Sequence, residues 1–405
     1  MTVDPATRPR RRFRLVLGWL LIVTSALGLM RLAWVALAPP IGQQQLPAEL
    51  AFLNRALSEG AGADMQVLFP EGEFFMHVLT GLAAAQTDPS LARDQLDAAL
   101  APDIAERFGE GMSIDYGIFY RGWSLMLAVE IAQATGDGSD ISVVADLAPD
   151  VSQALVDSPT GVPASYPGGY WPCDAVVAAT AVAQAAQVLE RPALIADMKT
   201  WRSVVTGLAD EELGLLPHRV GADGTAVDGP RGASQSLIQA FWPRLTTVLD
   251  GTPDLQSWLA FRDAFVVNVA GLVGVREHPI GVDGVGDVDS GPLIAGVSLS
   301  ASAVTLAAAR AYGDTALAAD LDREAELLGL PFQLAGERRY AAGVMPIGDA
   351  FLAWARSVPS SDNADISEQG PRIAWLLLAL PGLLLLTIGL VLRKPGRARR
   401  RRGCG

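Results

Sequence analysis

Cysteine and histidine are scarce in this 405-residue chain, which has two of the first and three of the second. The histidines, His77, His218 and His278, lie far apart and form no pair at the spacing of a zinc site. The chain has no phosphate-binding glycine loop, and the segment from Arg231 to Ser236 lacks the last glycine of a serine-hydrolase elbow. The sequence therefore predicts no metal site and no cofactor.

Basic residues are few between the two ends of the chain. Residues 40–371 hold 17 Lys/Arg and 43 Asp/Glu, which gives a net charge of −26. A domain this acidic repels nucleic acids and other anionic polymers, so these are excluded as partners. The remaining basic residues are concentrated near the chain ends, in residues 1–14 and 393–405.

Each basic end adjoins a long apolar segment. About twenty apolar residues suffice to cross a bilayer, and the first segment, residues 15–38, is long enough. It contains Arg31 near one end, where a long side chain can reach the headgroups. The second segment, residues 373–392, contains no charge. We therefore expect one transmembrane helix at each end and the lipid bilayer as a partner.

The basic ends also predict the orientation in the membrane. Lys/Arg clusters beside membrane spans stay on the cytoplasmic side. Both termini are then cytoplasmic, and residues 40–371 form an extracytoplasmic domain of a two-pass protein of the cell membrane. In the alternative interpretation the first segment is a signal peptide cleaved near Ala38.

Within the acidic domain, apolar residues recur at helical spacing and strand-like alternation is scarce. We therefore expect an all-α domain. The predicted helices cover residues 46–59, 73–86, 91–107, 118–136, 141–156, 172–188, 192–208, 233–248, 253–270, 291–311, 315–329 and 347–357.

Every second predicted helix follows a junction that is rich in glycine, proline, aromatic and acidic residues. These junctions lie at residues 70–73, 115–117, 166–174, 229–234, 286–292 and 346–349. A period of about 45 to 60 residues with one helical hairpin per period indicates a repeat architecture. We predict six hairpins in a closed ring, an (α/α)6 toroid whose rich junctions line a single basin. The alternative is that Gly, Pro and Asp merely begin helices.

The richest junction ends in Cys173, which precedes a predicted helix. The helix field would favour a thiolate there, so Cys173 is a candidate catalytic residue, with Tyr170 and Trp171 as substrate-binding neighbours. Cys404 lies on the other side of the membrane in this topology and cannot pair with it. The alternative is a buried cysteine and aromatic residues that cover a helix end.

The segment from Arg276 to Gly291 carries several acids and an imidazole. Glu277, Asp287 and Asp289 are candidates for a general acid and base, and His278 for substrate binding. A calcium loop of the EF-hand type is excluded because its twelfth position is a serine. We expect Arg231 to bind substrate or to pair with a carboxylate across the ring. The alternative is a solvated glycine-rich loop.

A third set of candidates begins at Asp115, a possible proton donor or base. Tyr116, Tyr120 and Trp123 follow it and would form the wall of a substrate site. Glu71 and Glu73 at the start of another helix are possible catalytic residues, and Glu73 is also a substrate-binding candidate. Alternatively, Phe119 and Trp123, four residues apart on one helix face, belong to the core, and the two glutamates only favour the helix start electrostatically.

The order of these segments resembles the linalool dehydratase/isomerase family. The resemblance rests on Tyr120-Arg121-Gly122, the aromatic stretch ending at Cys173, and Arg276-Glu277 with the acidic stretch that follows. It implies an extracytoplasmic (α/α)6 toroid that converts terpene alcohols without a cofactor. Cys173 would match the second of the family's two cysteines. Ala164 stands in place of the first, and Trp123 in place of its histidine.

These patterns leave three functions open. The first is a lyase or isomerase that acts by acid/base chemistry on an apolar terpenoid or prenyl alcohol. The second is a carbohydrate-active enzyme with a pair of carboxylates. The third is a module that binds a glycan or lipid without catalysis. The small-molecule partner is accordingly apolar or a sugar, and the sequence does not define an oligomeric state.

Overall fold

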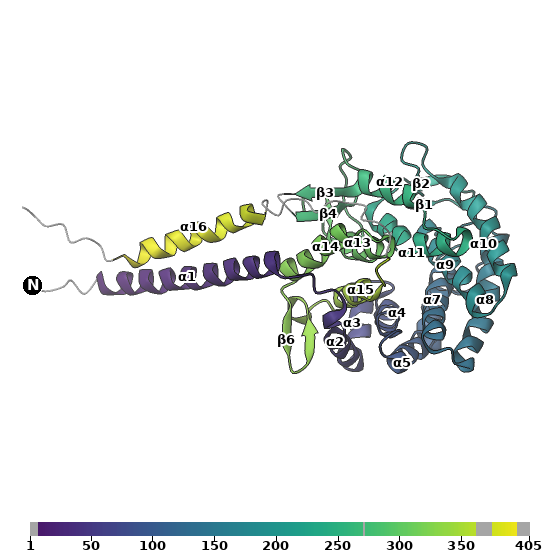
Figure 1. The fold of residues 1–405 in the computed structure, drawn as a ribbon, viewed down its shortest axis with the longest axis horizontal. Helices are drawn as coiled ribbons and strands as arrows, with labels where there is room; N and C mark the ends of the chain where they lie inside the picture. The colour runs from purple at the N-terminus through teal and green to yellow at the C-terminus, as the bar shows by residue number, and fades with distance from the viewer. Residues whose placement is uncertain (1–6, 270–271, 362–374, 395–405) are drawn as a thin grey trace, which may run out of the picture. The chain divides into compact units, whose positions relative to one another are not determined.

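The computed structural model describes residues 7–269, 272–361 and 375–394 (Figure 1). The chain divides into two compact units. One consists of Met1–Pro39, Val269–Leu272 and Gly370–Gly405, and the other of Pro40–Asn268 and Val273–Gln369. The second unit contains the acidic domain.

Six helices of the acidic domain form a closed inner ring. They are α4 (Gly72–Ala84), α7 (Gly117–Thr135), α9 (Pro172–Val188), α11 (Gly232–Asp250), α13 (Leu299–Tyr312) and α15 (Pro346–Ser357). Each of these helices packs against the next, and α15 packs against α4. These are the six helices that follow the rich junctions, so the alternation in the sequence predicted the inner ring correctly.

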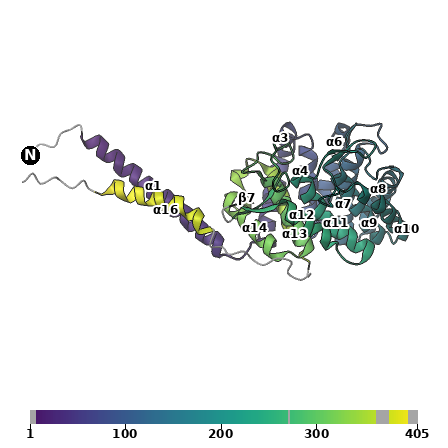
Figure 2. The same cartoon turned by 90° about the horizontal axis from the view of Figure 1, so that it is seen from above.

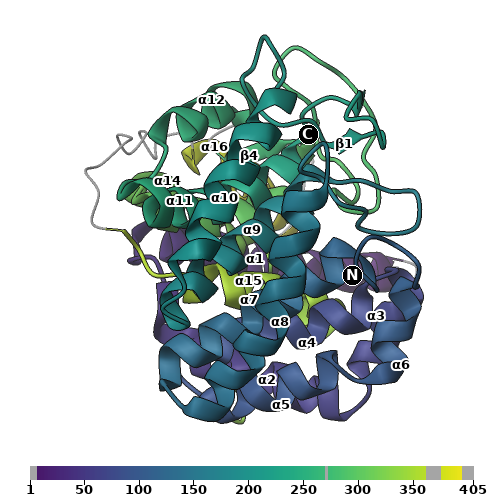
Figure 3. The same cartoon turned by 90° about the vertical axis from the view of Figure 1, so that its right-hand side faces the viewer.

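Six further helices lie outside this ring. They are α5 (Pro89–Ala99), α8 (Gly138–Asp157), α10 (Pro192–Val205), α12 (Leu255–Phe265), α14 (Thr315–Leu328) and α2 (Leu46–Ser58). The first five each pack on the inner helix before them, and α2 packs on α15 and α4. In Figure 3, α8 and α10 lie in front of α7 and α9. The described domain is therefore a mostly helical toroid of six helical pairs.

Burial explains which helices lie inside. Residues 172–186 of α9 are buried throughout, and most of them are small. Small residues allow close packing: a Cβ on Gly122 of α7 would lie 2.8 Å from the Cβ of Ala178 on α9. Outer helices such as α10 instead bury one stripe, which consists of Leu194, Met198, Trp201 and Val205.

A buried ion cluster joins α15 to its partner α2 and to α14 of the preceding pair. Arg356 on α15 has no exposed surface and donates hydrogen bonds to Asp322 at 2.7 Å and Glu326 at 2.9 Å, both on α14. It also donates to Glu49 on α2. The ring is thus closed by charge pairing between its N- and C-terminal parts.

Short strands and turns connect the hairpins. The antiparallel pairs are β1 (Arg219–Val220) with β2 (Ala226–Asp228) and β6 (Phe332–Leu334) with β7 (Glu337–Arg339). A three-stranded sheet holds β3 (Val266–Val269), β4 (Leu272–Arg276) and β5 (Val297–Ser298), with β4 in the middle. Further short helices are α3 (Ala61–Leu68) and α6 (Pro102–Ala105), with 3-10 turns at Gly42–Gln45, Glu106–Phe108, Thr206–Leu208 and Ala341–Gly343.

Several helix predictions were wrong at their ends. The helix expected over 253–270 ends at Phe265, because the β-branched valines that follow enter β3. The helix expected from 291 begins only at Leu299, where the Ser298 side chain accepts a hydrogen bond from a backbone N–H of the first turn. The helix expected over 91–107 is interrupted before Pro102.

The other unit contains two long helices, α1 (Thr7–Leu37) and α16 (Trp375–Arg393), which run side by side (Figure 2). Gly18 approaches Gly389 so closely that a Cβ on either would lie 3.0 Å or less from the other's carbonyl oxygen. Gly382 lies against Leu29, so the helices are antiparallel. Among the described residues, one helix is long and apolar enough to cross a membrane, over Arg12–Leu37 of α1.

The predicted second span remains a prediction. The apolar part of α16, Leu377–Arg393, is shorter than the usual spanning length. Residues 373 and 374 of the predicted span lie outside the described residues.

Candidate active site

The loop between β4 and β5 is fixed against the start of α11. The backbone N–H of Gly232 donates to the carbonyl of Glu277 at 2.8 Å, and the N–H of Glu277 donates to the carbonyl of Gly296 at 3.0 Å. A Cβ at position 232 would lie 1.9 Å from the carbonyl oxygen of Arg276. Only glycine permits this approach, which brings the acidic residues of the β4–β5 loop to the N-terminal end of the inner helix α11.

Asp287 organises the tip of this loop. Its Oδ1 accepts hydrogen bonds from the backbone N–H groups of Asp289 at 3.0 Å and Ser290 at 2.9 Å. The Ser290 hydroxyl in turn accepts one from the N–H of Asp287 at 2.8 Å. This is the local turn that aspartate favours, and it leaves the second carboxylate oxygen of Asp287 free for long-range contacts.

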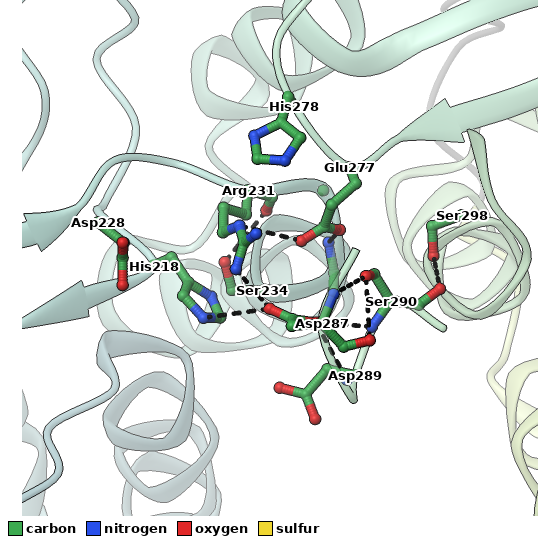
Figure 4. A network of polar contacts seen from close by, with 12 residues as sticks. His218, Asp228, Arg231, Ser234, Glu277, His278, Asp287, Asp289, Ser290 and Ser298 are labelled. Atoms are coloured by element: carbon green, nitrogen blue, oxygen red, sulfur yellow. Dashed lines mark hydrogen bonds and ion pairs between the residues drawn. The ribbon is translucent and has the colours of Figure 1, made fainter. Parts of the chain in front are cut away.

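Arg231 joins the loop's carboxylates at the start of α11. Its Nη1 lies 2.5 Å from Asp287, its Nε lies 3.2 Å from Glu277, and its Nη2 donates to the carbonyl of Val285 at 3.2 Å. Figure 4 shows the guanidinium between the two carboxylates. One cation thus holds two acids from different parts of the loop, as the sequence led us to expect for Arg231.

The two carboxylates held by Arg231 differ in their protonation. Burial raises the pKa of Glu277 to about 7, and the charge of Asp287 acts in the same direction. Burial also opposes ionisation of Asp287, but hydrogen bonds from Ser290 and the charge of Arg231 outweigh it and hold its pKa below the ordinary value. Near neutral pH, one group can carry a proton while the other is ionised.

His218 borders the same network from the residue before β1. Its Nε2 lies 3.8 Å from Oδ2 of Asp287 (Figure 4). Burial lowers the pKa of His218 to about 4, so its imidazole is neutral at pH 7. Its Nδ1 is buried and has no hydrogen-bond partner among the described residues. A neutral histidine can accept or donate a hydrogen bond to a bound hydroxyl group.

A second pair of side chains faces this loop from the first turn of α9. Asp174 is buried, and burial together with the charges of Asp289 and Glu71 raises its pKa to about 7. The Cys173 thiol donates to Oδ1 of Asp174 at 3.8 Å. Burial raises the pKa of Cys173 well above its ordinary value. The expectation of a thiolate at this position was therefore wrong, because desolvation outweighs the helix field.

The start of α4 contributes the last acid. Oε1 of Glu71 accepts a hydrogen bond from the Tyr166 hydroxyl at 2.7 Å. The pKa of Asp289 is raised to about 6 by the protein that surrounds its carboxyl group, although the residue keeps exposed surface, and the charges of Asp287 and Glu71 act in the same direction. Carboxyl groups from α4, α9 and the β4–β5 loop thus influence one another's ionisation.

Four of the six rich junctions come together at the candidate site through their side chains, a fifth reaches it through the backbone, and the sixth makes a different contact. Those at 70–73, 166–174, 229–234 and 286–292 are linked through the acids and Arg231 described above. The junction at 115–117 joins them through its backbone, since Ile118 donates to the carbonyl of Ala164 at 2.9 Å. In the last junction, Asp349 instead accepts a hydrogen bond from the N–H of Tyr340 at 2.7 Å.

Several predicted site residues lie outside this network. Asp115 is exposed, and its carboxylate accepts only a long local hydrogen bond from Gly111 at 3.4 Å among the described residues. Glu73 pairs with Arg107 at 2.6 Å. The proton-donor interpretation of Asp115 therefore has no geometric support.

The predicted aromatic wall is mostly core. Trp123 has no exposed surface and packs between Phe75 and Phe241, and Tyr120 is 2% exposed and donates to a backbone carbonyl on α5. The half-buried Tyr116 has Arg121 over its ring. These residues follow the alternative interpretation, in which helical spacing marks packing.

Three other predicted residues border the site, and one of them, His278, shares the Val285 carbonyl with Arg231. Trp171 meets Tyr166 edge to face, with ring centroids 5.5 Å apart. The backbone of Tyr170 pairs with Val220. Nε2 of His278 lies 3.1 Å from the carbonyl of Val285, and Figure 4 shows the ring on the far side of Arg231 from Asp287.

The sequence interpretation did not select Asp174 or His218, and it weighed Glu71 with Glu73 but selected only Glu73. Asp174 follows Cys173 directly, and Glu71 lies in the same junction as Glu73. His218 lies in a plain segment and gives no local signal, because only the fold brings it to Asp287.

Comparisons with known proteins bear on the fold. No family model and no curated protein matches the chain. Among solved structures, an unsaturated glucuronyl hydrolase specific for heparin matches with a TM-score of 0.51 and 12% identity, over 78% of this chain and 95% of that one. An inactive α-1,6-mannanase variant of Salegentibacter sp. HEL1_6 in complex with α-1,6-mannotriose matches with a TM-score of 0.45 and 16% identity, over 70% and 88%.

A D-mannose isomerase matches with a TM-score of 0.38 and 14% identity over 49% of this chain, which spans 61% of the isomerase's length. Identities this low show the fold alone. The chain is thus similar in fold to helical toroid enzymes, as the glucuronyl hydrolase shows. The comparisons give no support to the linalool dehydratase/isomerase family in particular.

Proposed function

We propose that this chain is a membrane-anchored, extracytoplasmic carbohydrate-active enzyme that works by acid/base catalysis. The observation that carries the proposal is the cluster of carboxyl groups in which Arg231 lies between Asp287 and Glu277 beside the buried Asp174, and in which the pKa values of the acids diverge. The pKa values of Asp174 and Glu277 are raised to about 7, whereas the pKa of Asp287 is held below its ordinary value. Such pairs supply a proton donor and an ionised partner at the same pH.

The roles follow from these protonation states. Asp174 would donate a proton to the oxygen of the bond that breaks, and the ionised Asp287 would take a proton from the attacking water. Arg231 would hold Asp287 in its ionised form through the 2.5 Å contact. Glu277 and the neutral His218 would hydrogen-bond sugar hydroxyls.

The charge of the cluster favours a neutral sugar. Five carboxyl groups converge here, and the guanidinium of Arg231 is already shared between two of them. A uronate or sulfated sugar would bring further negative charge to a site whose guanidinium is already shared between two carboxylates. The substrate class therefore differs from the heparin of the structural neighbour, despite the shared fold.

A second candidate is the lyase or isomerase acting on a terpenoid or prenyl alcohol. The contact between Cys173 and Asp174, beside the rings of Tyr166 and Trp171, favours it. A protonated thiol in an apolar wall could donate a proton to an alcohol. This reaction requires Cys173, whereas the carbohydrate mechanism does not.

The proposed location is the cell membrane, with both termini in the cytoplasm. The apolar helix α1 and the antiparallel packing of α16 along it support two spans. The basic clusters at residues 8–14 and 393–402 support the orientation. In intact cells, an impermeant maleimide should leave Cys404 unlabelled until the membrane is broken, and labelling without lysis would disprove this orientation.

The function is tested by turnover. The full chain, purified in detergent, is incubated with neutral manno- and gluco-oligosaccharides and with unsaturated uronyl disaccharides, and products are identified by mass spectrometry. We expect turnover of a neutral substrate, reduced roughly 10²- to 10⁴-fold in Asp174→Asn and in Asp287→Asn. The control Asp115→Asn should turn over the substrate at the wild-type rate, which would show that the loss of activity is specific to substitutions in the cluster. Full activity of both cluster variants would refute the assignment.

A further inference from the structure

The hairpin of β6 and β7 displays a set of apolar side chains to solvent. Along the chain from the end of α14, Leu328, Leu330, Phe332 and Leu334 are between 48% and 60% exposed. Residues 335 and 336 both have positive φ, which is typical of a tight two-residue hairpin turn. The exposed apolar residues therefore lie on a fixed support.

The charges of this hairpin are all engaged. Glu337 pairs with Arg55 on α2 at 2.6 Å, and Arg338 pairs with the buried Glu326. Arg339 lies over the ring of Phe332 at 5.6 Å. Residues 328–345 hold one acid and two arginines, in a domain whose net charge is −26. This is a locally non-acidic, apolar surface on a strongly acidic domain.

The β6–β7 hairpin lies near the first turn of the domain, at Gly42, which also contacts the end of α15. The N–H of Gly42 donates to Asp322 on α14 at 2.8 Å, and the side chain of Gln43 donates to the carbonyl of Ser357 at 3.0 Å. Six residues of α14 separate Asp322 from Leu328, about 9 Å of helix. The β7 strand also packs on α2, which begins four residues after Gly42.

Covalent geometry keeps this turn close to the end of α1. Helix α1 ends at Leu37, and only residues 38–41 precede the turn that starts at Gly42. Four residues span at most about 14 Å. If α1 crosses the membrane, the chain length between Leu37 and Gly42 therefore limits how far Gly42 can lie from the end of the span.

We propose that the β6–β7 hairpin is a membrane-docking element, whose apolar side chains Leu330, Phe332 and Leu334 enter the bilayer interface. It would hold the toroid against the membrane and restrict its rotation about the two anchors. The arginine beside Phe332 suits the headgroup region. The proposal rests on the membrane anchoring proposed above and is independent of the sugar chemistry.

The test places a fluorophore on the hairpin of the full chain. A Cys404→Ser background, in which Cys173 is buried, carries either Leu334→Cys or Phe332→Cys. The control is Val204→Cys on α10, which is 39% exposed and belongs to the hairpin opposite α15 in the ring. The labelled proteins are reconstituted in phosphatidylcholine vesicles with nitroxide on the acyl chains, and aqueous iodide serves as the second quencher.

We expect the nitroxide lipid to reduce fluorescence at positions 334 and 332 about two-fold or more, with protection from iodide, since interfacial elements enter the headgroup boundary. The label at position 204 should show the reverse. Quenching of the hairpin labels by iodide alone would overturn the docking proposal. Protection from both quenchers would also overturn it, because the hairpin would then be covered by protein. Vesicle flotation separates these results from a failure of the anchor, in which the chain would not float at all.

Discussion

Replacing Asp174 by asparagine removes a buried acid whose ionisation opposes folding. Its pKa rises from 3.8 to about 7 in the folded chain. The folded state therefore favours the neutral carboxyl, and this contribution is complete below pH 4 and lost as the pH rises through 7. A shift of about three pKa units corresponds to about 4 kcal/mol, so above pH 7 the wild type bears this cost and Asp174→Asn does not.

The assay is thermal unfolding of the full chain in detergent from pH 4 to pH 9. For a domain of this size, 1 kcal/mol moves Tm by about 2 °C or less, so Asp174→Asn should gain up to about 8 °C at pH 8. The gain should grow between pH 4 and 7 and stay level above. Asp140→Asn is the matched control, because hydrogen bonds from Arg93 hold the pKa of Asp140 below its usual range. That variant should lose stability, and a loss in both variants at pH 8 would refute the burial argument for Asp174.

Three other perturbations follow from the geometry. Gly232→Ala should displace the β4–β5 loop and abolish activity, because the new Cβ would lie 1.9 Å from the Arg276 carbonyl oxygen. Its control is Gly229→Ala, whose Cβ would meet no atom within 4 Å and which should keep the wild-type rate. Arg356→Met removes the cation that pairs with several buried acids, and it should lower the free energy of unfolding by about 3–5 kcal/mol in chemical denaturation. An unchanged free energy of unfolding would show that the ion cluster does not hold the ring closed. The turnover rate should fall above about pH 7, where Asp174 loses its proton, and a rate that rises through pH 7 would rule it out as the acid.

The ring could be predicted because its signals are local. Inner helices begin at junctions where glycine permits close approach, as at Gly232, and proline begins the helix, as at Pro172. Glu277, Asp287 and Asp289 were found because they gather in one segment. Arg231 was expected to need a carboxylate partner, which the fold supplies from that segment.

The remainder of the site depends on contacts between distant residues. His218 meets Asp287 only through the ring, and Asp174 owes its raised pKa to acids on other elements. The direction in which the pKa of Cys173 shifts also depends on burial, which outweighs the local helix field. Trp123 lies in the core because the inner face of α7 is buried along its whole length, which the aromatic composition alone does not reveal.

The most direct test of the central claim is ligand binding, measured as thermal stabilisation of the full chain in detergent. A ligand at one hundred times its Kd stabilises by about 2.7 kcal/mol, so no assay of the unknown reaction is needed. Neutral oligosaccharides should stabilise the wild type and Cys173→Ala alike, uronic oligosaccharides should not, and Glu277→Ala, which removes a proposed partner of the sugar hydroxyls, should reduce the effect. Stabilisation by prenyl alcohols alone, lost in Cys173→Ala, would contradict the carbohydrate assignment and favour the lyase or isomerase.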